Sequence, residues 1–246
     1  MAIGFIGSGN MARALARGLG DPVLATDAGS GRAAALAGEV GGEALAGNAE
    51  LAGRAEVIVL AHKPAQLEDV AGEIAPVARR VISLLAGVPL ERLRTAYPDS
   101  EVVRAMPNTA VEVREGVTCL CSAGAPELGP AARALFERVG LAVELPERLM
   151  DAATAVSGVA PAYVALIAEA WIDSAVRHGL PAAQAAELVG AALRGSATLL
   201  QARAMDTLAV RRGVTSPAGV TARGLAALEE AGLRTAFAHA ADEVLR

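Results

Sequence analysis

Residues 2–19 read AIGFIGSGNMARALARGL, which has the order strand, tight turn and helix. Ile3 to Ile6 are apolar or small, as in a buried strand, and Gly7-Ser8-Gly9 interrupts them before a helix-favouring run. A side chain at Gly9 would hold a pyrophosphate away from the amides that open the helix, and Ala12 fills the third small position of the dinucleotide-binding pattern. The stretch therefore predicts a nucleotide-binding turn, and its alternative is a plain structural turn.

The composition is that of a soluble chain long enough for two domains. Its 246 residues include 22 basic and 27 acidic side chains, for a net charge of -5, and no basic block indicates a nucleic-acid surface. The longest uncharged run, Ala152 to Ala168, is too short for a membrane span and contains Pro161. No basic segment precedes an apolar one at the N-terminus, so we expect no export signal and a cytoplasmic protein without membrane or nucleic-acid partners.

The two cysteines, Cys119 and Cys121, lie two residues apart on one face of a predicted strand. That spacing does not favour a disulfide, and no second pair of ligands accompanies them for zinc. We therefore predict that both pack in the core, and we predict no metal site.

Short apolar segments alternate with helical segments through residues 1–146. The apolar segments are near-continuous, which is typical of a parallel sheet covered on both faces. The alternation predicts an α/β fold with a Rossmann-like, doubly wound sheet. The predicted strands span residues 3–6, 23–26, 56–61, 80–85, 101–106, 117–121 and 141–145.

Scarce polar residues follow several of these strands. Lys63 is the single lysine of the chain, and the only asparagines are Asn10, Asn48 and Asn108. The carboxyl ends of the strands form the ligand crevice of an open α/β sheet. We therefore expect these four side chains near a bound ligand; for Lys63 the alternative is a solvated surface lysine.

Asp27 follows the second predicted strand, twenty residues after Gly7. A carboxylate at this position usually binds the hydroxyls of the adenosine ribose and repels a 2′-phosphate. Alternatively, Asp27 caps the next helix, and Ser30 and Arg32 hold that phosphate. The choice between NADH and NADPH is open at this point.

After about residue 146 the predicted strands end and the remaining segments are helical. The helices span residues 148–157, 160–178, 181–203 and 220–246. They are rich in alanine and poor in bulky side chains, so this all-helical domain, residues 147–246, makes a thin core by itself. We expect it to pack against a second copy as a homodimer.

A polar, turn-rich segment, residues 214–221 (VTSPAGVT), precedes the last predicted helix. Free backbone amides of residues 219–221 at a helix start would bind a carboxylate, helped by the helix dipole. The Thr221 hydroxyl would reach the neighbouring atom of the same ligand. The alternative is an ordinary helix start capped by Ser216 or Thr215.

Six segments resemble one enzyme family in the right order along nearly the whole chain. They are GFIGSGNMARAL, LAHKP, LLAGVPLERL, RAMPNTAVEVREGVT, VSGVAPAYVALIAEA and VTSPAGVTARGLAALEE. They resemble the pyrroline-5-carboxylate reductases, which catalyse the last step of proline synthesis. The resemblance implies a Rossmann domain followed by a helical dimerisation domain, a reduced nicotinamide coenzyme (NADPH or NADH), a small cyclic imino acid as substrate, and dimers that assemble into larger rings.

The resemblance also implies roles for individual residues. The coenzyme would contact Gly7, Ser8, Gly9, Asn10, Met11, Asn48, Ala61, Lys63, Leu84 and Ala86. The substrate would contact Glu147, Ser216, Gly219, Val220 and Thr221. Thr221 would hydrogen-bond the ring nitrogen and relay a proton from water, which makes it the predicted catalytic residue. Glu147 also opens a predicted helix, where an acidic residue is favourable without any ligand.

Several positions depart from the family pattern. Val159-Ala160 replaces the usual Ser-Gly, Ala218 replaces a glycine, and His62 replaces an apolar residue. If position 218 requires a positive φ, alanine there costs about 1 kcal/mol or more. Two further functions therefore stay open, namely a reductase of another cyclic imine and a dinucleotide-binding regulator without turnover.

Overall fold

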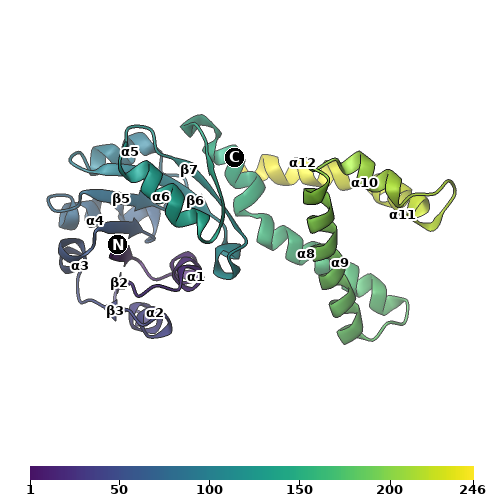
Figure 1. The fold of residues 1–246 in the computed structure, drawn as a ribbon, viewed down its shortest axis with the longest axis horizontal. Helices are drawn as coiled ribbons and strands as arrows, with labels where there is room; N and C mark the ends of the chain where they lie inside the picture. The colour runs from purple at the N-terminus through teal and green to yellow at the C-terminus, as the bar shows by residue number, and fades with distance from the viewer. The chain divides into compact units, whose positions relative to one another are not determined.

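The computed structural model describes residues Met1–Arg246 and divides them into two compact units, Met1–Pro161 and Ala162–Arg246. Unit 1 contains a sheet with helices on both of its faces, and unit 2 contains helices alone (Figure 1). Residues 147–161, which the sequence places with the helical domain, are grouped with the sheet by this division.

Unit 1 is built on one eight-stranded sheet with the strand order β3-β2-β1-β4-β5-β6-β7-β8. All neighbouring strands run parallel except β6 and β7. This topology confirms the predicted doubly wound sheet, because the chain runs outward on one side of β1 and then crosses to the other side at β4. The strands are β1 (Ile3–Ile6), β2 (Leu24–Thr26), β3 (Glu43–Ala44), β4 (Val57–Leu60), β5 (Arg80–Ser83), β6 (Glu101–Pro107), β7 (Gly116–Cys121) and β8 (Gly140–Glu144).

Helices cover each face of the sheet over a separate hydrophobic core. One core includes Phe5 and Phe136, and the other includes Tyr97 and both cysteines, which are buried and free as predicted. The described chain holds no cluster of His, Cys, Asp and Glu suited to a metal ion. The helices of unit 1 are α1 (Asn10–Leu19), α2 (Arg32–Val40), α3 (Asn48–Arg54), α4 (Leu67–Ile74), α5 (Leu90–Ala96), α6 (Leu128–Glu137) and α7 (Met150–Ala153).

The reversal between β6 and β7 was not predicted. The connection after Pro107 is short and contains a 3₁₀ segment, Thr109–Val113, and a parallel crossover needs a dozen or more residues. Asn108 organises this connection, since its Oδ1 accepts hydrogen bonds from the amides of Ala110 and Val117. Asn108 is therefore a structural residue of the sheet, and it does not line the cavity at the carboxyl ends of β1, β2, β4 and β5.

Unit 2 contains the helices α8 (Ala160–Arg177, which begins at the end of unit 1), α9 (Ala182–Ala202), α10 (Thr207–Gly213), α11 (Val220–Glu230) and α12 (Leu233–Val244). The single helix predicted for residues 220–246 is wrong, because Gly232 adopts a φ of 82° and separates α11 from α12. Helix α10 was missed, although Asp206 caps it by accepting a hydrogen bond from the Ala209 amide at 2.9 Å.

Unit 2 leaves most of its apolar side chains exposed. Only Ala185 and Val189 of this unit are buried, and Leu166 and Trp171 on α8 are 66% and 49% exposed. Tyr163 and Phe237 make one internal contact, edge to face with ring centroids 6.3 Å apart. By length and composition alone, the helical segment Glu147–Arg177 is apolar enough to cross a membrane, a criterion that packed helices of soluble proteins also meet.

Candidate active site

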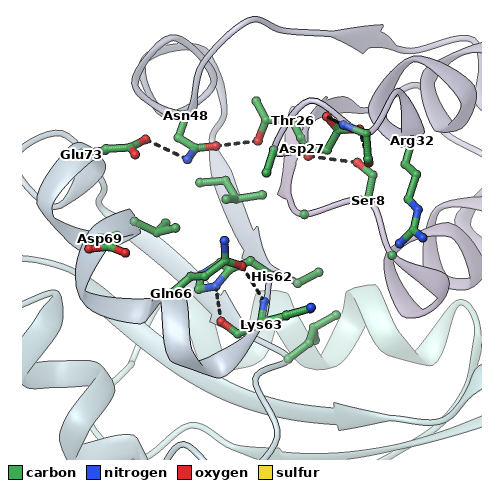
Figure 2. A pocket seen from close by; sticks show the side chains of 18 of the residues that line it. Ser8, Thr26, Asp27, Arg32, Asn48, His62, Lys63, Gln66, Asp69 and Glu73 are labelled. Carbon is green, nitrogen blue, oxygen red and sulfur yellow. Dashed lines mark hydrogen bonds between the residues drawn. The ribbon is translucent and has the colours of Figure 1, made fainter.

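A cavity of about 780 Å³ lies at the carboxyl ends of β1, β2, β4 and β5 in unit 1 (Figure 2). It occupies the point where the strand order reverses, which is where open α/β sheets bind ligands. Nine of the eleven residues predicted to contact a coenzyme line it: Gly7, Ser8, Gly9, Asp27, Asn48, Ala61, Lys63, Leu84 and Ala86. Asn10 and Met11 do not line it and form the first turn of α1.

The glycine turn has the properties that a pyrophosphate requires. Gly7 has a φ of +95°, and an added Cβ would lie 2.6 Å from the backbone carbon of Ala61, so only glycine fits. A Cβ on Gly9 would meet no atom within 4 Å and would occupy free space. Helix α1 has no side-chain cap and no acidic residue in its first turn. Its N-terminal amides and dipole are therefore available to an anion.

Asp27 lies at the cavity, but its carboxylate is engaged by its own loop. Oδ1 accepts hydrogen bonds from the amides of Gly29 and Ser30, and Oδ2 accepts them from the Ser30 hydroxyl and the Ala33 amide. These bonds, the Ala33 amide first, lower the pKa of Asp27. Asp27 therefore bonds an amide in the first turn of α2, in the manner of the capping alternative, although the N-cap residue itself is Gly31. The side chain of Arg32, which also lines the cavity, makes no ion pair or hydrogen bond.

Asn48 is held between two other side chains of the cavity wall (Figure 2). Its Oδ1 accepts a hydrogen bond from the Thr26 hydroxyl at 2.7 Å, and its Nδ2 donates to Glu73 Oε2 at 2.8 Å. Because a hydroxyl donates at one end and a carboxylate accepts at the other, the orientation of the amide is defined. The sequence interpretation missed Glu73 and Asp69; their spacing of four residues on the helix after HKP was the available signal.

His62 and Lys63 follow β4 directly. His62 Nδ1 lies 2.9 Å from the Lys63 carbonyl oxygen, and its Nε2 is buried without a partner. Burial lowers the pKa of His62 below its usual value of 6.5, so the ring is neutral at neutral pH and donates through Nδ1. Lys63 lines the cavity, and its ammonium forms no ion pair.

Glu147 is not among the residues that line the cavity. Its Oε1 accepts hydrogen bonds from the Leu90 amide at 3.0 Å and from Arg104 Nη1 at 2.7 Å. Arg104 is only 3% exposed and also bonds Asp151 at 2.9 Å. These ion pairs attach the start of the 147–161 segment to β6.

The start of α11 carries no side-chain cap. Gly219 is the N-cap residue in extended conformation, so the alternative in which Ser216 or Thr215 caps the helix is wrong. The expectation that the Gly219 amide is free is also wrong, since it donates to the Ser216 carbonyl oxygen at 3.0 Å. The amides of Val220 and Thr221 have no such partner. Ala218 has a φ of 57°, so alanine at this position bears the strain of a positive φ.

Comparisons with known proteins cover both units. The family described as "Pyrroline-5-carboxylate reductase dimerisation" matches residues 147–246, and "NADP oxidoreductase coenzyme F420-dependent" matches residues 2–87. The pyrroline-5-carboxylate reductase of Synechocystis sp. is 43% identical over 78% of this chain and 74% of its own length. The one from Methanosarcina acetivorans is 35% identical over 97% of this chain and 93% of its own.

Solved structures agree with the sequence relatives. Plasmodium falciparum pyrroline carboxylate reductase with NADP bound has a TM-score of 0.89 at 28% identity, covering 99% of this chain and 95% of that one. A pyrroline-5-carboxylate reductase from Coxiella burnetii has a TM-score of 0.86 at 31% identity, covering 98% and 95%. This chain belongs to the pyrroline-5-carboxylate reductase family.

Proposed function

We propose that this chain is an NAD(P)H-dependent oxidoreductase that reduces the C=N bond of 1-pyrroline-5-carboxylate to give L-proline, the last step of proline biosynthesis. The observation that carries the proposal is the glycine-lined cavity at the switch point of the sheet, in a chain similar to such reductases over 97% of its length. Residues 1–146 would bind the coenzyme, and residues 147–246 would bind the substrate and the second subunit.

The cavity supplies a binding group for each part of a dinucleotide. Gly7, Ser8 and Gly9, with the first amides of α1 at Asn10 and Met11, would hold the pyrophosphate. Asn48 would contact the adenosine half, and Lys63 would contribute a cation near a phosphate or ribose. Small and apolar residues after β4 and β5 would line the nicotinamide end: Ala61, Leu84 and Ala86.

The loop after β2 favours NADPH over NADH. The Asp27 carboxylate is occupied by three hydrogen bonds from its own loop and one from the first turn of α2, which makes it a poor ligand for ribose hydroxyls. Arg32 lines the same part of the cavity and has no carboxylate partner. An unpaired guanidinium in a cavity that Ser30 also lines suits a 2′-phosphate.

The substrate would be held by residues at the start of α11. The substrate carboxylate would bind the free amides of Val220 and Thr221 and would be stabilised by the helix dipole. Ser216 and the backbone of Gly219 would also contact the substrate. When bound, the reduced nicotinamide supplies a hydride to the imine carbon. The Thr221 hydroxyl would donate a hydrogen bond to the ring nitrogen and relay a proton from water. Glu147 would contact the substrate from its position beside Arg104.

A homodimer formed through the helices of unit 2 accounts for their exposed apolar side chains. Residues 162–246 bury almost nothing within one chain, and the matched family is described by its dimerisation. A second copy would cover Leu166 and Trp171, so the apolar segment Glu147–Arg177 would lie in a protein interface of a cytoplasmic enzyme. Larger rings of dimers are the next level of assembly that we propose.

An assay of coenzyme oxidation tests the reaction. The purified chain is given NADPH or NADH together with 1-pyrroline-5-carboxylate, its six-membered homologue, or a pyrroline without the carboxylate. We expect oxidation with 1-pyrroline-5-carboxylate, fastest with NADPH, and slow turnover of the imine that lacks the carboxylate. No oxidation with 1-pyrroline-5-carboxylate would refute the proposal, and faster turnover of another imine would reassign the substrate.

Replacement of Thr221 tests the catalytic assignment. Thr221→Val keeps the shape of the side chain and removes its hydroxyl, so we expect kcat to fall by about a hundredfold with little change in melting temperature. Thr198→Val is a matched control, because that hydroxyl bonds only the Arg194 carbonyl oxygen within α9. Turnover by Thr221→Val at the rate of this control would remove Thr221 from the mechanism.

A further inference from the structure

The walls of the coenzyme cavity differ in charge (Figure 2). Arg32 and Ser8 lie on one side, close to the starts of α1 and α2. Asp27 lies on this side too, but hydrogen bonds occupy both of its carboxylate oxygens. On the opposite side α4 contributes two carboxylates, Asp69 and Glu73, which also line the cavity. This acidic wall is not explained by phosphate binding, because carboxylates repel phosphates.

The two carboxylates occupy one face of α4, since they are four residues apart. The carboxylate of Asp69 is exposed and makes no hydrogen bond or ion pair with any other residue of the chain. Glu73 accepts a hydrogen bond from Asn48 through Oε2, and no residue bonds its Oε1. Three carboxylate oxygens on this wall are therefore free acceptors, and an ionised carboxylate has no hydrogen to donate.

The acidic wall is also connected to the glycine turn. The Thr26 carbonyl oxygen accepts hydrogen bonds from the Gly7 amide at 3.1 Å and the Ser8 hydroxyl at 3.0 Å. The Thr26 hydroxyl then donates to Asn48, and Asn48 donates to Glu73. This chain of bonds fixes Glu73 at a defined position relative to the place where a pyrophosphate would lie.

We propose that Asp69 and Glu73 select the base of the coenzyme by accepting hydrogen bonds from the 6-amino group of adenine. The inference rests on the proposed function, because it takes a dinucleotide as the ligand of this cavity. The phosphates would bind on the side of Arg32 and the glycine turn. The adenine would therefore lie on the side of Asp69 and Glu73. On the base of an adenine nucleotide only the 6-amino group has N–H donors. A 6-oxo purine presents a lone pair at the same position, and its one N–H donor lies on N1 and points in a different direction.

Binding of two dinucleotides to the full chain tests this proposal. Calorimetry gives Kd for NADPH and for its analogue with hypoxanthine in place of adenine, which exchanges the 6-amino group for a 6-oxo group. We expect the unmodified protein to bind NADPH about tenfold more tightly or better, as for a hydrogen bond to a charged acceptor. The double variant Asp69→Asn, Glu73→Gln offers amide donors to the 6-oxo group, so we expect its preference to vanish or to invert.

Glu68→Gln is the matched control, because Glu68 lies on the same helix, pairs with Arg92 and does not line the cavity. It should keep the preference of the unmodified protein. Equal affinity of the unmodified protein for both dinucleotides would overturn the inference, and so would an unchanged preference in the double variant. Failure of the unmodified protein to bind either dinucleotide would instead overturn the proposed function.

Discussion

The two units contain similar proportions of apolar residues but bury them differently. In unit 1 both faces of the sheet are covered, and side chains such as Phe5, Ile58 and Phe136 are almost completely removed from water. In unit 2 only Ala185 and Val189 are buried. Burial of apolar area is the main source of folding free energy, so unit 1 is stabilised by its own core and unit 2 requires another surface.

The largest expected effect follows from placing a charge on the exposed face of α8. Leu166→Glu puts two carboxylates, one from each subunit, into the apolar interface that we propose. An unpaired buried charge costs several kcal/mol, so we expect the dimer dissociation constant to rise by about a hundredfold or more. Sedimentation velocity over a range of protein concentrations measures the change.

The exposed and already charged Glu169 on the same helix provides the control, as Glu169→Gln should leave the dimer intact. NADPH binding to unit 1 should survive Leu166→Glu, because its cavity is lined only by residues of unit 1. A Leu166→Glu protein that sediments as a normal dimer would show that this face of α8 is not the interface.

The second expected effect concerns unit 1 alone. Arg104→Met leaves the carboxylate of Glu147, whose Oε2 is buried without a partner, next to an apolar side chain. We expect the free energy of unfolding to fall by about 2 kcal/mol, because Glu147, which is 34% exposed, loses the buried guanidinium that bonds its carboxylate. Urea unfolding measures it. Arg133→Met, which removes an exposed pair with Glu137, should cost less than about 1 kcal/mol, and an equal loss in both variants would refute this view of Arg104.

The third expected effect concerns the strained loop of unit 2 that contains Ala218. Ala218 has a φ of 57°, so Ala218→Gly relieves backbone strain and should raise the free energy of unfolding by about 1 kcal/mol. Ala222→Gly, in the first turn of α11, should have the opposite sign, because glycine is unfavourable in a helix. Calorimetric melting measures the change in the free energy of unfolding for both variants. Destabilisation by Ala218→Gly would mean that the loop does not hold this conformation in solution.

The smallest expected effect concerns the partly buried ring of His62. Burial lowers its pKa in the folded chain, so below about pH 6.5 the unfolded chain binds a proton that the folded chain does not. Stability contributed by the neutral ring is complete above pH 6.5 and is lost as the pH falls toward the folded-state pKa. His62→Leu should therefore lose less stability than the unmodified protein between pH 7.5 and about pH 5.5 in urea unfolding. An identical pH dependence in both proteins would contradict the burial of this ring.

Local sequence patterns were sufficient to predict most of the fold of unit 1. The family resemblance supplied several of the individual cavity residues, such as Ala61, Leu84 and Ala86. The near-continuous apolar strands and the glycine turn at Gly7–Gly9 identified the sheet and its ligand-binding edge. Each of these features depends on residues that are close in sequence, namely a buried strand followed by a turn with little room for side chains. The direction of β7 and the two-residue strand β3 were missed, because pairing of strands is decided by partners far along the chain.

The sequence by itself determined that the chain has a dinucleotide-binding turn, a doubly wound sheet and a run of helices after it. Only the tertiary structure decided which distant polar groups pair: Glu147 bonds Arg104, and Asn48 bonds Thr26 and Glu73. It alone also brought Asp69 and Glu73 to the cavity wall. The reason is physical, since periodicity and turn chemistry act over a few residues, whereas the partner of a hydrogen-bonding group is set by atoms distant in the chain.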